Sequence, residues 1–185
     1  MKAISIIAVF ILLSFGFSKN QTKVKITNKS EVTIKGKSNV NAFECKYDSE
    51  YIENDLQVSI LRNNSKIVLD GAKLAIKSTG FDCAHKMITK DFKTILKADE
   101  YPHIVINVKE INTIKESITA KLHVKIAGVE KEYVVPITYN PNNGNVKGLL
   151  KLNIQDFQLK SPKKLLGMVV VNDNVEINFN LFLQY

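Results

Sequence analysis

Apolar and polar residues alternate along most of this chain of 185 residues. In residues 117–128 five apolar side chains fall on one side of an extended backbone: Ile118, Ala120, Leu122, Val124 and Ile126. A period of two is typical of a β-strand that buries one face and exposes the other. The same pattern recurs in residues 24–34, 40–47, 56–61, 66–70, 73–78, 103–111, 131–139, 145–154 and 174–184.

Strands of this kind, joined mostly by short turns such as Asp70-Gly71, predict an all-β protein with an antiparallel barrel or sandwich. Closure of a barrel removes the free edge strands that otherwise favour aggregation. We therefore expect a barrel of about eight strands, which has room for side chains alone or for one small ligand.

One segment, Phe81–Ile104, breaks the alternation. Its apolar residues have the spacing of one face of a helix: Met87, Ile88, Phe92, Ile95 and Leu96. Thr89 is a suitable N-cap, and Pro102 prevents the helix from continuing. The pattern predicts one short amphipathic helix around residues 89–98, whose apolar face covers an opening of the barrel.

The first residues have the features of an export signal. Met1-Lys2 is positive, residues 3–17 are apolar and uncharged, and a small residue follows at Ser18. A retained membrane anchor is the alternative, but a spanning helix needs about 20 apolar residues. We expect a signal peptide at residues 1–18 and a single domain at residues 19–185, located in the periplasm or secreted.

The formal net charge is +8, and nearly all of the positive charge is lysine, since Arg62 is the only arginine. Many lysines occupy alternate positions of the predicted strands, as in residues 119–126. Proteins that recognise nucleic acid depend on arginine and cluster their charge. We interpret the lysines as a solvated outer face. No nucleic-acid partner is expected, and a transient contact with an anionic membrane surface stays open.

The chain has two cysteines, Cys45 and Cys83, which export would place in an oxidising compartment. The simplest expectation is one disulfide. The nearby His85 raises a metal or thiolate site as an alternative, but the cysteines form no CxxC pair and only two further histidines exist, His103 and His123. A structural metal site normally has four ligands. We therefore expect neither a metal site nor a cofactor.

Signals for catalysis are lacking in the sequence. There is no G-x-S-x-G segment, and the serines stand in turns or strands without a positioned histidine. Asp99-Glu100 is typical of a solvated loop pair. The sequence predicts no catalytic residue, and an uncharacterised hydrolase is kept only as an alternative.

Several segments, in order along the chain, resemble the YceI-like family of exported, lipocalin-like proteins. They are "GKSNVNAFECKY", "KSTGFDCAHKMITKDFKTILKADEYPHIVI", "ITAKLHVKIAGVEKEYVVPITY", "LNIQDFQL" and "NDNVEINFNLFL". The resemblance covers essentially the whole mature chain. It implies an extended antiparallel barrel with an internal apolar tunnel that binds a long isoprenoid-type lipid, such as a polyprenyl or quinone-like chain. Many members carry a histidine in the first long strand, where this chain has "SNVNAFE", so a head-group contact made there is not transferred.

The candidate ligand contacts are aromatic residues expected near the cavity or its mouth: Phe43, Phe81, Phe92, Tyr101, Phe157 and Phe179. The region of residues 81–101 is favoured, because a helix over a barrel opening is where a lipid would enter. Ordinary core packing is the alternative for each residue. The expected function is non-enzymatic binding, and transport, of the lipid; the alternative is a filled barrel that acts as an envelope-stress or protein-interaction module.

Overall fold

The computed structural model of this protein describes residues 21–52, 54–114, 117–164 and 169–185. The predicted signal peptide, residues 1–18, lies outside the described residues. Within them no helix has the length and apolar character needed to cross a membrane.

Strands make up most of the described chain, as the alternation predicts. In the first half the elements are β1 (Gln21–Ile26), β2 (Glu31–Lys37), β3 (Ala42–Tyr47), η1 (Ser49–Tyr51), β4 (Asn54–Asn63), β5 (Lys66–Asp70), β6 (Lys73–Lys77), η2 (Ser78–Gly80), β7 (Phe81–Asp82) and α1 (Lys86–Ile95). In the second half they are β8 (His103–Ile114), β9 (Ser117–Ile126), β10 (Val129–Asn140), β11 (Asn145–Asn153), η3 (Ile154–Phe157), β12 (Lys163–Lys164), β13 (Val169–Val170) and β14 (Asn174–Gln184).

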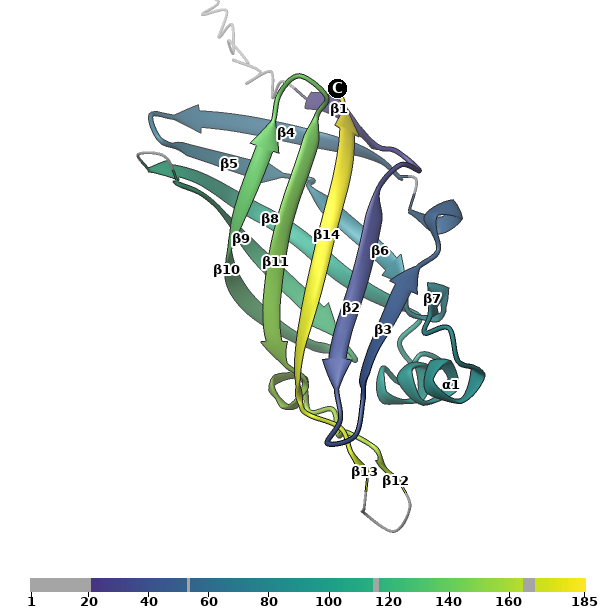
Figure 1. Ribbon diagram of the computed structural model, residues 1–185. Helices are drawn as coiled ribbons and strands as arrows, with labels where there is room; N and C mark the ends of the chain where they lie inside the picture. Colours follow the sequence, from purple (N-terminus) through teal and green to yellow (C-terminus); the bar gives the residue numbers. More distant parts are fainter. Residues whose placement is uncertain (1–20, 53, 115–116, 165–168) are drawn as a thin grey trace, which may run out of the picture.

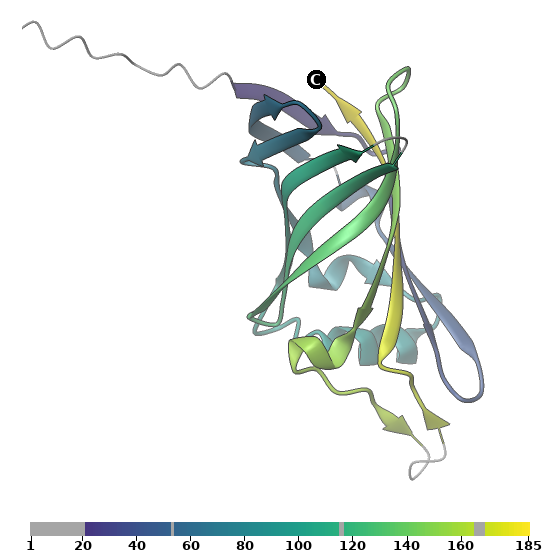
Figure 2. The same cartoon turned by 90° about the vertical axis from the view of Figure 1, so that its left-hand side faces the viewer.

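Eight of these strands close a ring in the order β1-β4-β5-β8-β9-β10-β11-β14 (Figures 1 and 2). Every pairing in the ring is antiparallel. The seam between β1 and β14 consists of the pairs Lys25–Gln184 and Ile26–Leu183. The prediction of an antiparallel barrel is therefore confirmed, although the ring is uneven.

β1 and β2 act as one strand that is interrupted at residues 27–30, because both lie along the same edge of β14. At the interruption the Thr27 N–H donates to the Phe182 carbonyl at 3.0 Å. The Phe182 N–H in turn donates to the Ser30 hydroxyl at 2.9 Å. The Ser30 side chain replaces a backbone acceptor, so β14 stays hydrogen-bonded through the break.

β5 and β6 likewise form one interrupted strand along β8, with Gly71 at the break. The φ of Gly71 is +88°, and an added Cβ would lie 2.1 Å from the Gln57 carbonyl oxygen. Glycine is needed here for its backbone conformation and for this close approach. On its other edge, β8 pairs with β9, and that pairing has a register shift between Val108 and Glu110.

β2, β3 and β7 extend the sheet beyond the ring, and α1 lies beside β7 at that end of the barrel (Figure 1). The apolar side of α1 packs on the core through Ile88, Phe92 and Ile95. Met87, predicted on that side, is instead 61% exposed.

α1 begins at Lys86, so the prediction of Thr89 as its N-cap and of bounds around 89–98 is wrong at the start. The Thr89 hydroxyl accepts from the Cys83 N–H and donates to the Asp82 carboxylate, both at 3.0 Å. It therefore fastens the chain that leads into the helix to the first turn, instead of capping the helix end. The preceding residue, His85, makes no side-chain capping hydrogen bond.

Cys45 of β3 and Cys83 form the predicted disulfide, which confirms that expectation. Both cysteines are buried, with 0% and 5% of their surface exposed. Because Cys83 lies between β7 and α1, the bond ties the start of the helix segment to the wall of the barrel.

We predict that replacing both cysteines with alanine lowers the free energy of unfolding by about 4 kcal/mol, the loop-entropy value for a separation of 38 residues. Urea unfolding of wild type and variant measures the difference. Reductant should lower the stability of the wild type and leave the variant unchanged. Equal unfolding midpoints for the oxidised wild type and the variant would contradict the stabilising role.

Candidate functional site

The inner face of the ring is apolar and forms the candidate site. Its residues on β9, β10 and β11 are mostly buried: Ala120, Leu122, Val124, Ile126, Val135, Ile137, Leu150 and Leu152. Ile104 of β8 is also buried, but most inward residues of β8 and those of β14 are only half-buried: Ile106, Val108, Ile111, Val175, Ile177, Phe179, Leu181 and Leu183. β8 and β14 lie opposite one another in the ring order, so partly accessible apolar surface faces the interior from two sides.

Two of the predicted aromatic residues lie against glycines of the neighbouring strand. Phe43 on β3 pairs with Gly36 on β2, and Phe179 on β14 pairs with Gly148 on β11. A Cβ added at either glycine would lie 2.2 Å from the Cζ of its ring. Each ring therefore fills the space that a side chain at the glycine would take, close to the wall.

Phe81 and Phe92 belong to an aromatic cluster that joins α1 to the wall. The ring centroids of Phe81 and Phe92 are 5.4 Å apart, and those of Tyr47 and Phe81 are 5.0 Å apart. The Tyr47 hydroxyl accepts from the Lys77 N–H at 3.1 Å, and burial raises the pKa of Tyr47. This cluster holds the helix in place, while contact of Phe81 or Phe92 with a ligand stays a prediction.

Phe157 lies at another point of the interior, on η3, and is almost fully buried. Its ring stacks on Tyr133 of β10 at a centroid distance of 6.3 Å. Burial raises the pKa of Tyr133, and the charge of Asp156 adds to this effect. The Tyr133 hydroxyl is buried and has no hydrogen-bond partner among the described residues.

Tyr101, the remaining predicted contact, lies apart from these groups. Its side chain is 36% exposed and its ring lies next to Gly128 in the β9–β10 turn. The six predicted residues thus lie in four different places. Phe43 and Phe179 lie close to the wall, Phe81 and Phe92 belong to the cluster at α1, Phe157 stacks on Tyr133, and Tyr101 lies at the surface.

Sequence reasoning did not single out Tyr47, Tyr133 or the glycines at 36 and 148. Tyr133 and Gly148 do occupy inward positions of the period-two pattern. Tyr133 could have been identified from the sequence, because its hydroxyl group stands at a position that the pattern directs toward the apolar interior. The glycine–phenylalanine pairs depend on strand register, which the pattern does not give.

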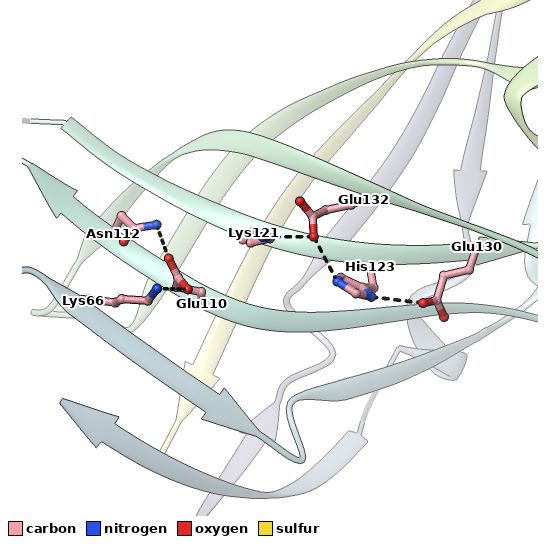
Figure 3. Close-up of polar contacts among 7 residues, drawn as sticks. All are labelled: Lys66, Glu110, Asn112, Lys121, His123, Glu130 and Glu132. Carbon is pink, nitrogen blue, oxygen red and sulfur yellow. Dashed lines mark hydrogen bonds and ion pairs between the residues drawn. The ribbon is translucent and has the colours of Figure 1, made fainter. Parts of the chain in front are cut away.

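The outer face carries an ionic network across β9 and β10 (Figure 3). Glu132 lies 3.0 Å from the Lys121 ammonium and 3.3 Å from His123 Nε2, and His123 Nδ1 lies 3.0 Å from Glu130. The hydrogen bond from Lys121 holds the pKa of Glu132 below its usual value. The two imidazole nitrogens contact different carboxylates. The imidazole and the two carboxylates therefore do not surround one common binding point.

Glu110 of β8 forms a second ionic group on this face, with Lys66 and Asn112 (Figure 3). The hydrogen bond from Lys66 lowers the pKa of Glu110. Among the described residues no group of three or more histidine, cysteine, aspartate or glutamate side chains could hold a metal ion. The geometry of both groups is that of cross-strand pairs that support the sheet.

A closed antiparallel ring with an apolar inner face and a helix at one end defines a lipocalin-like β-barrel protein. The family model described as "YceI-like domain" matches residues 15–183, so the chain belongs to the YceI-like family. A search of curated proteins finds no match.

Two solved structures are similar to this chain. Burkholderia cenocepacia BcnA is 19% identical over 85% of this chain and 97% of that chain, with a TM-score of 0.62. Campylobacter jejuni YceI is 18% identical over 69% of this chain and 81% of that chain, with a TM-score of 0.41. The similarity to BcnA supports the fold.

We predict that Gly148→Ala lowers the free energy of unfolding by roughly 1–3 kcal/mol, because the added methyl group pushes the Phe179 ring off the wall. Urea unfolding measures the loss. Phe179→Leu in the same chain should recover part of it, since the shorter side chain leaves room for the methyl group. The outward substitution Lys147→Ala is the control. A Gly148→Ala protein as stable as this control would contradict the close fit.

Proposed function

We propose that the exported chain binds a long isoprenoid-type or quinone-like lipid inside the ring and carries it through water without changing it chemically. Membership of a family that the resemblance associates with such lipids supports this proposal. The absence of a recognisable nucleophile–base pair in the sequence supports a role in binding.

The observation that carries the proposal is the partial accessibility of inward apolar residues on β8 and β14. Water reaches the inner face of a closed sheet only through the interior, since neighbouring strands are about 4.8 Å apart. A tightly filled barrel would bury these residues as fully as Val124 and Val135, which are each 1% exposed. Residual accessibility on opposite walls supports an interior with space for a guest.

The energetics favour a long apolar guest. Each methylene transferred from water into an apolar interior gains about 0.8 kcal/mol. The cost of ordering a flexible chain reduces this gain. An isoprenoid tail, with many apolar carbons, has a large total gain.

Export through the predicted signal peptide fits the Cys45–Cys83 disulfide, because disulfides persist in oxidising compartments. We propose a periplasmic or secreted location. A carrier in such a compartment would move its lipid between membranes or to a membrane enzyme.

Solvent extraction of the purified mature protein, followed by mass spectrometry, tests the proposal. We expect a co-purifying lipid with a long apolar chain. A clean extract, together with no uptake of added polyprenols, would contradict the proposal and favour the filled-barrel alternative. A generic esterase screen addresses the hydrolase alternative.

We predict that Ile177→Trp reduces the amount of extracted lipid several-fold, because it places a large ring on the inner face of β14. The matched control is Asn178→Trp, which places the same ring on the outer face. Circular dichroism checks that both variants are folded. Equal lipid content in the two variants would contradict the interior as the binding site.

A further inference from the structure

A line of lysines follows the exposed side of α1. Lys86, Lys90 and Lys93 recur at the spacing of one helix face, and Lys97 follows in the turn after the helix. All four line one surface groove of about 850 Å³ between α1 and the segments around η1, η2 and β7. The apolar residues of α1 pack on the core, so this α1 lysine line lies on another side of the helix.

The α1 lysines differ from many lysines of the strands in having no ion-pair partner within the described part of the chain. Strand lysines are matched to carboxylates across the sheet, for example Lys23 to Asp55 at 2.9 Å and Lys151 to Glu176 at 3.1 Å. The ammonium groups of the α1 lysine line are therefore available to an external anion.

Four carboxylates also line the groove: Asp48, Asp82, Asp99 and Glu100. Asp48 accepts from the Glu50 N–H at 3.0 Å. Asp82 accepts from the Ala84 N–H and the Thr89 hydroxyl, both at 3.0 Å. Among the described residues none of the four carboxylates forms an ion pair with the α1 lysine line. Asp48 and Asp82 thus bind the local backbone and Thr89, and the lysines form no contact ion pair with the carboxylates of the groove.

Amphipathic side chains stand next to the lysines. Met87, beside Lys86, is 61% exposed, and Tyr51 on the facing side of the groove is 46% exposed. The Lys77 ammonium lies 4.5 Å from the centre of the Tyr51 ring. Lysines with neighbouring exposed apolar and tyrosine side chains are typical of surfaces that lie at the headgroup level of a membrane.

We propose that the α1 lysine line docks this protein on the anionic phosphate surface of a lipid bilayer. The inference rests on the proposed function, because a carrier of a membrane lipid must collect and release its cargo at a bilayer. The four ammonium groups bind the lipid phosphates at contact, because the four carboxylates that line the same groove cancel much of their attraction at longer range. Met87 and Tyr51 contact the boundary between headgroups and acyl chains. A purely acidic protein surface would match the lysines but would leave the exposed Met87 without a partner.

Co-sedimentation of the full mature protein with vesicles tests the docking surface. Vesicles of phosphatidylcholine alone are compared with vesicles that also contain phosphatidylglycerol. We expect at least about tenfold tighter binding to the anionic vesicles at low salt, and loss of this difference at high salt. The variant Lys86→Gln/Lys90→Gln/Lys93→Gln/Lys97→Gln should lose about tenfold or more of the binding.

The matched control removes the same charge from exposed lysines elsewhere: Lys73→Gln/Lys125→Gln/Lys147→Gln/Lys160→Gln. It should keep most of the binding. Equal losses in the two variants would mean that net charge alone attracts the protein, and an α1 variant that binds like the wild type would exclude the lysine line; either result overturns the proposal. The salt dependence of the wild type is a second measurement that needs no variant.

The vesicles contain no isoprenoid, so this assay does not depend on the cargo. Solvent extraction of the same preparations reports the cargo separately. Vesicle binding without extracted lipid would contradict the carrier function alone, whereas extracted lipid without vesicle binding would contradict the docking surface alone.

Discussion

Closure of the sheet between β1 and β14 is the constraint on which the rest of the structure depends. The seam has two residue pairs next to the interruption between β1 and β2, and the Ser30 hydroxyl keeps β14 hydrogen-bonded there. With the seam closed, the alternating apolar faces of eight strands surround one interior. Without it, β14 would lose its β1 partner and the inward residues of β1 and β14 would meet solvent.

Much of this fold is predictable from the sequence because an antiparallel strand with one buried face imposes a period of two on its residues. The long strands β8 to β11 and β14 agree closely with the expected segments. The disulfide is predictable because the chain has two cysteines and its first residues predict export to an oxidising compartment. The start of α1 was missed because the Thr89 hydroxyl binds the preceding Asp82 and Cys83, a contact that depends on the path of the chain before the helix.

The candidate site is less predictable than the fold, for a physical reason. The pattern gives the inward face of each strand but not the register that places Phe179 over Gly148 or Phe43 over Gly36. The pattern also treats every inward aromatic residue alike, although the Phe157 ring stacks on the Tyr133 ring. How much of the interior is occupied depends on these pairwise fits, which a one-dimensional pattern does not contain.

α1 connects the two surfaces for which functions are proposed. Its apolar side reaches the barrel wall through Phe92 and Phe81, and its other side presents the α1 lysine line to solvent. The Cys45–Cys83 disulfide fixes the segment between β7 and α1. A bilayer bound by the lysines would therefore lie beside the end of the barrel at which α1 packs.

The central claim is that β8 and β14 face each other across a space that an apolar chain can occupy. A crystal structure of the protein, purified after export and never exposed to organic solvent, tests it most directly. We expect continuous elongated density between the inner faces of these two strands, in contact with Val108 and Ile177. Side chains that meet across the interior and leave no such density would contradict the claim.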